Sequence, residues 1–101
     1  MKNEILALIG TNITDPSWIE SYVENVTPLL LEHGGRYLTR TDKVELIEGN
    51  QKPQFQVVTE FPSKEVALKF YNSAEYAPYK TARLQGSEST FILVPIENEA
   101  G

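Results

Sequence analysis

Four side chains in the second half of the chain have types and spacing that could do chemistry. Glu60 lies near the end of an otherwise apolar stretch, and a carboxylate removed from water has a raised pKa and can act as a general base. Tyr76 and Arg83 are seven residues apart, which puts them on one face of a helix. Because a break at Ser73 would fold this helix back toward the strand end, we predict that four side chains approach one another: Glu60, Tyr71, Tyr76 and Arg83.

The sequence leaves two roles open for Arg83 in this arrangement. It could neutralise Glu60 in a structural ion pair, or it could leave that carboxylate free to bind a polar group of a ligand. Both roles require Glu60 and Arg83 to lie on the same side of the protein.

The other candidates each have a structural interpretation as well. His33, the only histidine, could transfer a proton near neutral pH, but the dipole at a helix C-terminus also favours a histidine. Arg36 could hold a carboxylate or phosphate, or pair with Glu60 or Glu48. Three tyrosines could line a small pocket or simply dock a short helix, namely Tyr71, Tyr76 and Tyr79. The catalytic candidates are therefore Glu60, His33 and Tyr71, and the ligand-binding candidates are Arg36, Glu60, Tyr71, Tyr76 and Arg83.

Composition and motifs argue against several classes of function. The chain has 101 residues and a net charge of −5, which disfavours binding to nucleic-acid phosphates. With no cysteine and one histidine, it lacks the ligand sets of common metal sites, and it contains no phosphate loop, nucleotide fingerprint or Ser-His-Asp arrangement. Its longest apolar stretches are far too short to span a bilayer. We expect a cytoplasmic protein without metal, cofactor, nucleic-acid partner or membrane partner.

The elements that must position these residues follow from periodicity and turn chemistry. Apolar and β-branched runs predict strands at residues 5–13, 36–41, 55–61 and 88–96, while residues 43–47 either prolong the second strand or form a separate ribbon. Asp15 and Pro16 predict a helix start, and that helix extends to about His33. Ser63 caps the next helix, which breaks at residues 72–73 before a second short helix.

This order predicts an α+β fold of the ferredoxin-like, split βαβ type, with a four-stranded antiparallel sheet and its helices on one face. Residues 1–96 form one domain, and residues 97–101 form a frayed tail. The first and last strands are apolar on both faces, and one helical layer covers only one of them. We therefore predict a homodimer, in which the uncovered faces of two sheets pack together.

The chain resembles an uncharacterised bacterial family, domain of unknown function thirteen-thirty, of the dimeric α+β barrel superfamily. The resemblance runs from about Asn12 to the last strand and depends on the order and spacing of these residues: Asp15-Pro16, Tyr22, Gly34-Gly35-Arg36-Tyr37, Glu48-Gly49, Glu60-Phe61-Pro62-Ser63, Ala67, Phe70-Tyr71, Ser73, Tyr76 and Arg83. It implies the fold and the dimer, but it brings no assigned reaction.

The resemblance also supplies two hypotheses for function. Dimeric α+β barrels include cofactor-independent oxygenases and isomerases that act on aromatic or lactone-type metabolites between sheet and helices, although a shared fold does not imply a shared function. One hypothesis is a dimer that binds a small molecule between its sheet and helices. The alternative is a cofactor-independent, monooxygenase-like or isomerase-like enzyme, with Glu60 as the base, His33 or a tyrosine as the acid, and Arg36 or Arg83 holding an anionic substrate.

Overall fold

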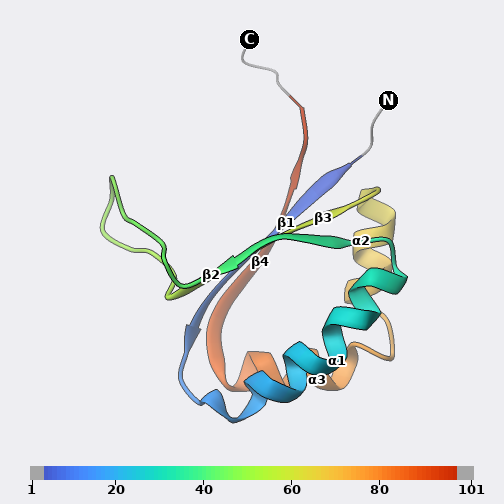
Figure 1. Ribbon diagram of the computed structural model, residues 1–101, viewed down its shortest axis with the longest axis horizontal. Helices are drawn as coiled ribbons and strands as arrows, with labels where there is room; N and C mark the ends of the chain where they lie inside the picture. The colour runs from blue at the N-terminus through green and yellow to red at the C-terminus, as the bar shows by residue number, and fades with distance from the viewer. Residues whose placement is uncertain (1–3, 98–101) are drawn as a thin grey trace.

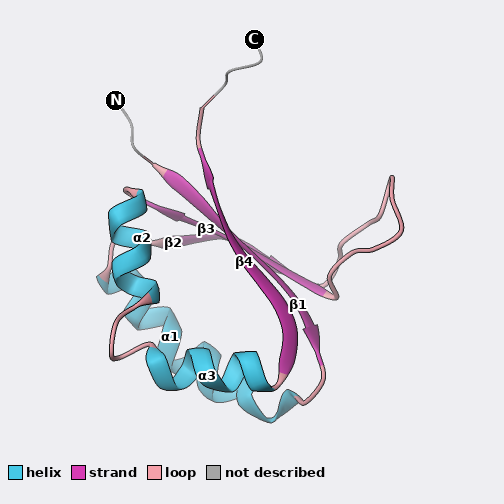
Figure 2. Ribbon diagram, turned by 180° about the vertical axis from the view of Figure 1, so that it is seen from behind, coloured by secondary structure: helices cyan, strands magenta, loops and turns pink. Residues whose placement is uncertain are grey.

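The structure of the protein is a computed structural model that describes residues 4–97. Its elements in chain order are β1 (Ile5–Ile13), the 3-10 helix η1 (Pro16–Trp18), α1 (Ile19–Glu32), β2 (Arg36–Thr41), β3 (Phe55–Phe61), α2 (Lys64–Tyr71), α3 (Ala77–Gln85) and β4 (Ser87–Pro95). The strands form one antiparallel sheet in the order β2-β3-β1-β4. All the labelled helices lie on the same side of this sheet (Figures 1 and 2). This confirms the predicted α+β, ferredoxin-like architecture.

The helix ends follow from the capping residues identified in the sequence. The Asp15 side chain accepts a hydrogen bond from the Ser17 backbone N–H at 3.0 Å, but it caps the short η1 turn, so α1 itself starts later than predicted, at Ile19. Ser63 Oγ accepts from the Val66 N–H at 3.2 Å and fixes the start of α2. Gly34 has a φ of +80°, the left-handed conformation that ends a helix at little cost only for glycine.

The ribbon predicted at residues 43–47 is wrong, because residues 42–54 contain no strand and form a long excursion from the sheet (Figure 1). Side-chain hydrogen bonds fasten its end in place of a strand ladder. Gln54 Oε1 accepts from the Ile13 N–H at 2.8 Å, and the Gln54 N–H donates to Asn12 Oδ1 at 2.9 Å. Of the tail predicted at residues 97–101, all but Glu97 lies outside the described residues.

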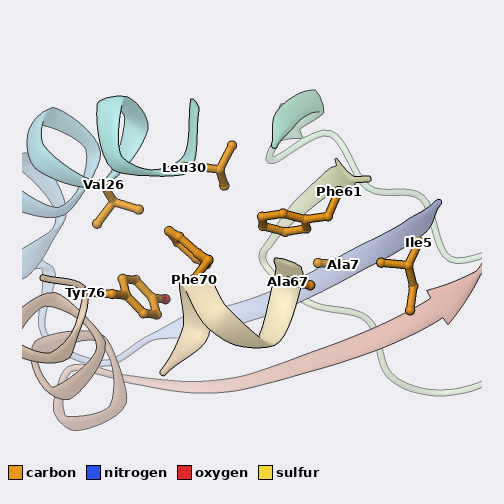
Figure 3. Close-up of a cluster of buried hydrophobic side chains, with 8 residues drawn as sticks. All are labelled: Ile5, Ala7, Val26, Leu30, Phe61, Ala67, Phe70 and Tyr76. Atoms are coloured by element: carbon orange, nitrogen blue, oxygen red, sulfur yellow. The ribbon is translucent and has the colours of Figure 1, made fainter. Parts of the chain in front are cut away.

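The core lies between the sheet and the helices. It is built from apolar side chains of β1, β3, α1 and α2 together with Tyr76, namely Ile5, Ala7, Val26, Leu30, Phe61, Ala67, Phe70 and Tyr76. Figure 3 shows Phe70 between Phe61 and Tyr76, and its ring centroid lies 5.6 Å from that of Phe61 and 4.6 Å from that of Tyr76. None of the helices in residues 4–97 is long and apolar enough to cross a membrane.

We predict that Phe70→Ala strongly destabilises the protein, because it leaves a cavity between two aromatic rings. Phe70 is 2% exposed, and truncating a buried phenylalanine costs about 3–5 kcal/mol. Urea unfolding at equilibrium measures the change. Leu68→Ala on the exposed side of the same helix is the control and should cost much less. Equal losses for the two variants would mean that the packing of α2 is described wrongly.

Candidate functional site

An apolar pocket lies between the helix-facing side of the sheet and α1. It has a volume of about 100 Å³ and continues to an opening at the surface. Its wall is mainly aliphatic and aromatic and includes Ile9, Val57, Phe61, Trp18, Tyr22, Val26 and Phe70. Two cationic side chains also line it, Arg40 and Arg83.

Strand and helix periodicity together produce this wall. In β3 the odd-numbered residues from Phe55 to Phe61 face the helices, because side chains alternate between the two faces of a strand. In α1 the pocket-lining residues Ile19, Tyr22, Val26 and Leu30 recur at intervals of three or four, so they share one face. The pocket thus lies between two apolar surfaces that the sequence pattern identifies separately.

Trp18 closes one side of the pocket, and a glycine makes its position possible. Its indole Nε1–H donates to the Gly86 carbonyl at 3.1 Å, and the Thr14 and Asp15 N–H groups donate to the same oxygen at 3.0 Å each. A Cβ atom at residue 86 would overlap the Trp18 ring, so Gly86 is needed where the end of α3 meets η1.

Two tyrosine hydroxyl groups meet beside the pocket. Tyr22 from α1 and Tyr76 from the start of α3 form a hydrogen bond of 2.6 Å between their hydroxyl oxygens. Burial is the largest cause that raises the pKa of both phenols, and for Tyr22 the neighbouring Tyr76 raises it further. Both groups therefore stay protonated and act as hydrogen-bonding groups at neutral pH.

The Arg83 guanidinium lies next to these tyrosines and is almost completely buried, with 2% of the residue exposed. Its Nη1 donates to Ser89 Oγ on β4 at 2.6 Å, and its Cζ lies 5.8 Å from the Phe91 ring centroid. Burial lowers the pKa of Arg83, but the adjacent Tyr76 and Tyr22 raise it by more, so the net direction is upward. The two phenols raise this pKa by charge attraction and by their closeness as side-chain hydrogen-bonding groups, but neither reaches Nε or Nη2 with the geometry of a hydrogen bond, so both nitrogens lack a partner among the described residues.

The prediction that Glu60 approaches Arg83 is wrong. Glu60 lies between Thr59 and Phe61, which face the helices, so its own side chain points to the opposite face of the sheet. There it pairs with Arg36, whose Nη2 and Nε lie 2.7 and 2.8 Å from Glu60 Oε1. Arg36 sits directly opposite Glu60 in the β2–β3 register. The two residues therefore form an ion pair outside the pocket.

His33 and Tyr71 also lie away from the pocket wall. His33 Nδ1 is 2.9 Å from the Leu29 carbonyl in the last turn of α1, and its ring packs on the edge of Phe70. The Tyr71 ring contacts Phe91 edge-to-face and packs at a tilt against Tyr76, and Lys80 Nζ lies 4.2 Å from its centroid. Both arrangements match the structural interpretations of these side chains. Within residues 4–97, no three histidine or acidic side chains are grouped as metal ligands.

The pocket-lining residues of η1 and α1 were not predicted as site residues from the sequence. Trp18 and Tyr22 have the periodicity of core residues, and nothing in that pattern distinguishes a packed side chain from one that lines a cavity. Arg40 was also missed. Its guanidinium lies 3.9 Å from the Tyr37 ring centroid. Residues three apart in a regular strand face opposite sides, and the break in the β2–β3 register between Tyr37 and Thr39 lets both side chains line the pocket.

Several solved structures share this fold. The structure is similar to a protein of unknown function from Rhodopseudomonas palustris, with a TM-score of 0.80 at 13% identity over 97% of this chain and 85% of that one. It is also similar to SnoaB, a cofactor-independent oxygenase from Streptomyces nogalater, with a TM-score of 0.67 at 14% identity over 97% of each chain. A putative antibiotic biosynthesis monooxygenase from Nitrosomonas europaea gives a TM-score of 0.55 at 9% identity over 100% of this chain and 97% of that one.

At these identities the similarities establish the fold alone, an α+β fold with a four-stranded antiparallel sheet. The chain belongs to the family described as domain of unknown function DUF1330, whose model matches residues 5–96. This confirms the family resemblance found in the sequence. No protein with a curated description matches the chain.

We predict that the Tyr22–Tyr76 pair makes stability fall with rising pH in the alkaline range. The pKa of both phenols is raised from 10.0, so above that pH the unfolded chain releases protons that the folded chain keeps. Their contribution is complete below about pH 10 and is lost as the pH rises toward the higher folded pKa. Tyr22→Phe should therefore flatten the decline in unfolding free energy between about pH 9 and 11, measured by urea titration. An unchanged slope in both Tyr22→Phe and Tyr76→Phe would contradict this assignment.

Proposed function

We propose that the protein binds a small aromatic molecule in the pocket between its sheet and α1. The observation that carries this proposal is the pocket itself, a mainly apolar cavity of about 100 Å³ with a guanidinium and phenol groups at its edge. Binding sites for small molecules combine an apolar wall with a few polar groups that set orientation. A closed apolar cavity of about 150 Å³ admits a benzene ring, so this pocket suits a ligand with a small ring that extends toward the opening.

The polar ligand-binding residues in this proposal come from the helices that cover the sheet. Arg83 and Tyr76, both proposed from the sequence, form its polar group together with Tyr22. Arg36 and Glu60 take a structural role on the other face, where a partly exposed ion pair contributes less than about 1 kcal/mol. Tyr71 supports the site indirectly, by packing on Tyr76.

The second candidate function is a cofactor-independent enzyme acting on an aromatic or lactone-type metabolite. Two observations favour it. One is the similarity to SnoaB, which is described as a cofactor-independent oxygenase. The other is the phenol pair beside the Arg83 guanidinium, because hydrogen-bond donors and a fixed positive charge stabilise an enolate or phenolate oxygen that forms during a reaction. Product analysis of any bound molecule separates the two functions, since a binding protein returns its ligand unchanged.

We further propose a homodimer formed through the sheet face opposite the helices. In one row of this face Val58 pairs with Leu8 and Leu8 with Ile92, and in the next row Leu6 pairs with Val94. Ile92 is 52% exposed, although an apolar row of this kind is normally covered by a partner. The charged residues of these two rows neutralise each other as the Arg36–Glu60 pair, so two copies can meet face to face without repulsion.

To test the ligand site, Val57→Phe fills the pocket from β3, and Leu84→Phe adds a ring on the exposed side of α3, outside the pocket and away from the proposed interface. Thermal shift with phenol, 2-naphthol, benzoate and coumarin should give at least one compound that raises the melting temperature of the native protein and of Leu84→Phe. Val57→Phe should lose that shift. If none of these compounds binds, or if Val57→Phe binds as well as the native protein, the pocket is not the ligand site.

For the dimer, light scattering after size exclusion at micromolar concentration should give twice the chain mass. Ile92→Glu should produce monomers, because a charge buried in an apolar interface is costly. Leu84→Glu on α3 is a matched control, since Leu84 is also 52% exposed but lies on the helical side, and it should leave the dimer intact. A monomeric native protein would refute the assembly.

A further inference from the structure

The unpartnered edge of the Arg83 guanidinium identifies the polar group of the ligand. Nη1 donates to Ser89 Oγ, whereas Nε and Nη2 are buried without hydrogen-bond partners. Nε and Nη2 carry parallel N–H bonds on one side of the planar group, and this side binds two oxygens of a carboxylate at once. Buried donors are normally hydrogen-bonded, so an arginine with a purely structural role would be expected to use both of these donors within the fold.

The charge of Arg83 points in the same direction. Among residues 4–97, no carboxylate forms an ion pair with it, and Glu60 pairs with Arg36 on the other face of the sheet. Its nearest polar neighbours are the hydroxyl groups of Tyr22, Tyr76 and Ser89, which are neutral at physiological pH. Burying an arginine without an anion is costly, so a negatively charged group that enters the pocket gains a strong partner.

We infer that the ligand of the sheet–helix pocket is a small aromatic carboxylic acid, whose carboxylate binds to Nε and Nη2 of Arg83 while its ring occupies the apolar cavity. This inference rests on the proposed function and adds the chemical class of the ligand. A neutral ring compound fits the cavity equally well but leaves the guanidinium edge unpaired. A single phenolate or enolate oxygen uses one donor well and leaves the other unsatisfied.

Tyr22 has a part in this binding mode. Arg83 lines the pocket, but its two unpartnered nitrogens are buried, so a carboxylate in the pocket reaches them only when a covering side chain rotates. Tyr22 both lines the pocket and interacts with the guanidinium, and it is less buried than Tyr76. We therefore assign the rotation to Tyr22, with breakage of its hydrogen bond to Tyr76.

The test compares each acid with its neutral amide, which has nearly the same shape. Calorimetric titration of the full chain uses benzoate against benzamide and 2-naphthoate against 2-naphthamide. At least one acid should bind about tenfold or more tightly than its amide, because hydrogen bonds to a charged group are the stronger kind. If acid and amide bind equally, this inference fails and the proposed function stands. If neither acids nor amides bind, this inference fails, and the thermal-shift panel with the neutral ring compounds decides the proposed function.

Two variants locate the anchor. Arg83→Met keeps most of the side-chain volume and should abolish the preference for the acid, whereas Lys80→Met removes a charge from the same helix outside the pocket and should keep it. If Arg83→Met does not fold, Arg83→Lys keeps the charge without the parallel donors, and the preference should fall severalfold. Loss of the preference in Arg40→Met with full retention in the Arg83 variant would overturn the inference, because Arg40 would then be the anchor.

Discussion

The buried guanidinium of Arg83 is the constraint on which the rest of the site depends. It contacts α1 through Tyr22, the start of α3 through Tyr76, and β4 through Ser89. A second hydrogen bond stabilises the same junction, because the Ser87 side-chain Oγ donates to the Arg83 main-chain carbonyl at 2.5 Å. A charge in this position is tolerated because several neutral hydroxyl groups surround it, and that same environment strengthens its attraction for an anion. One side chain thus joins the helices to the last strand and gives an apolar pocket its polar group.

Most of the fold could be predicted, because local and periodic signals agreed. The strands at 5–13, 36–41 and 55–61 have the predicted bounds, and the last strand is shifted by one residue, since alternation and β-branched composition define them without tertiary information. The caps at Ser63 and Gly34 are set by backbone geometry that few residues satisfy. Residues 43–47 were misassigned because weak alternation of polar residues resembles an edge strand, and only the hydrogen bonds of Gln54 to the end of β1 show that the chain loops there.

Only part of the site could be predicted from the sequence, because the side chains of a strand alternate between its two faces and the sequence does not say which face the helices cover. The side chains of Tyr76 and Arg83 do lie close together, as their spacing of two helical turns predicts. Glu60 does not, because adjacent residues of a strand point to opposite faces and Phe61 takes the helical one. Since β1 is apolar on both faces, the sequence did not say which face the helices cover, so the side of Glu60 stayed open. The cavity itself has no sequence signal, because it depends on how completely the side chains of the sheet and α1 fill the space between them.

The most direct test of this account is a crystal structure of the full chain grown with benzoate. The account predicts the ring in the cavity between β3 and α1, with both carboxylate oxygens about 2.8 Å from Nε and Nη2 of Arg83. It also predicts a Tyr22 side chain turned away from Tyr76. Benzoate bound on the outer face of the sheet, or in the pocket with its carboxylate on Arg40, would contradict it.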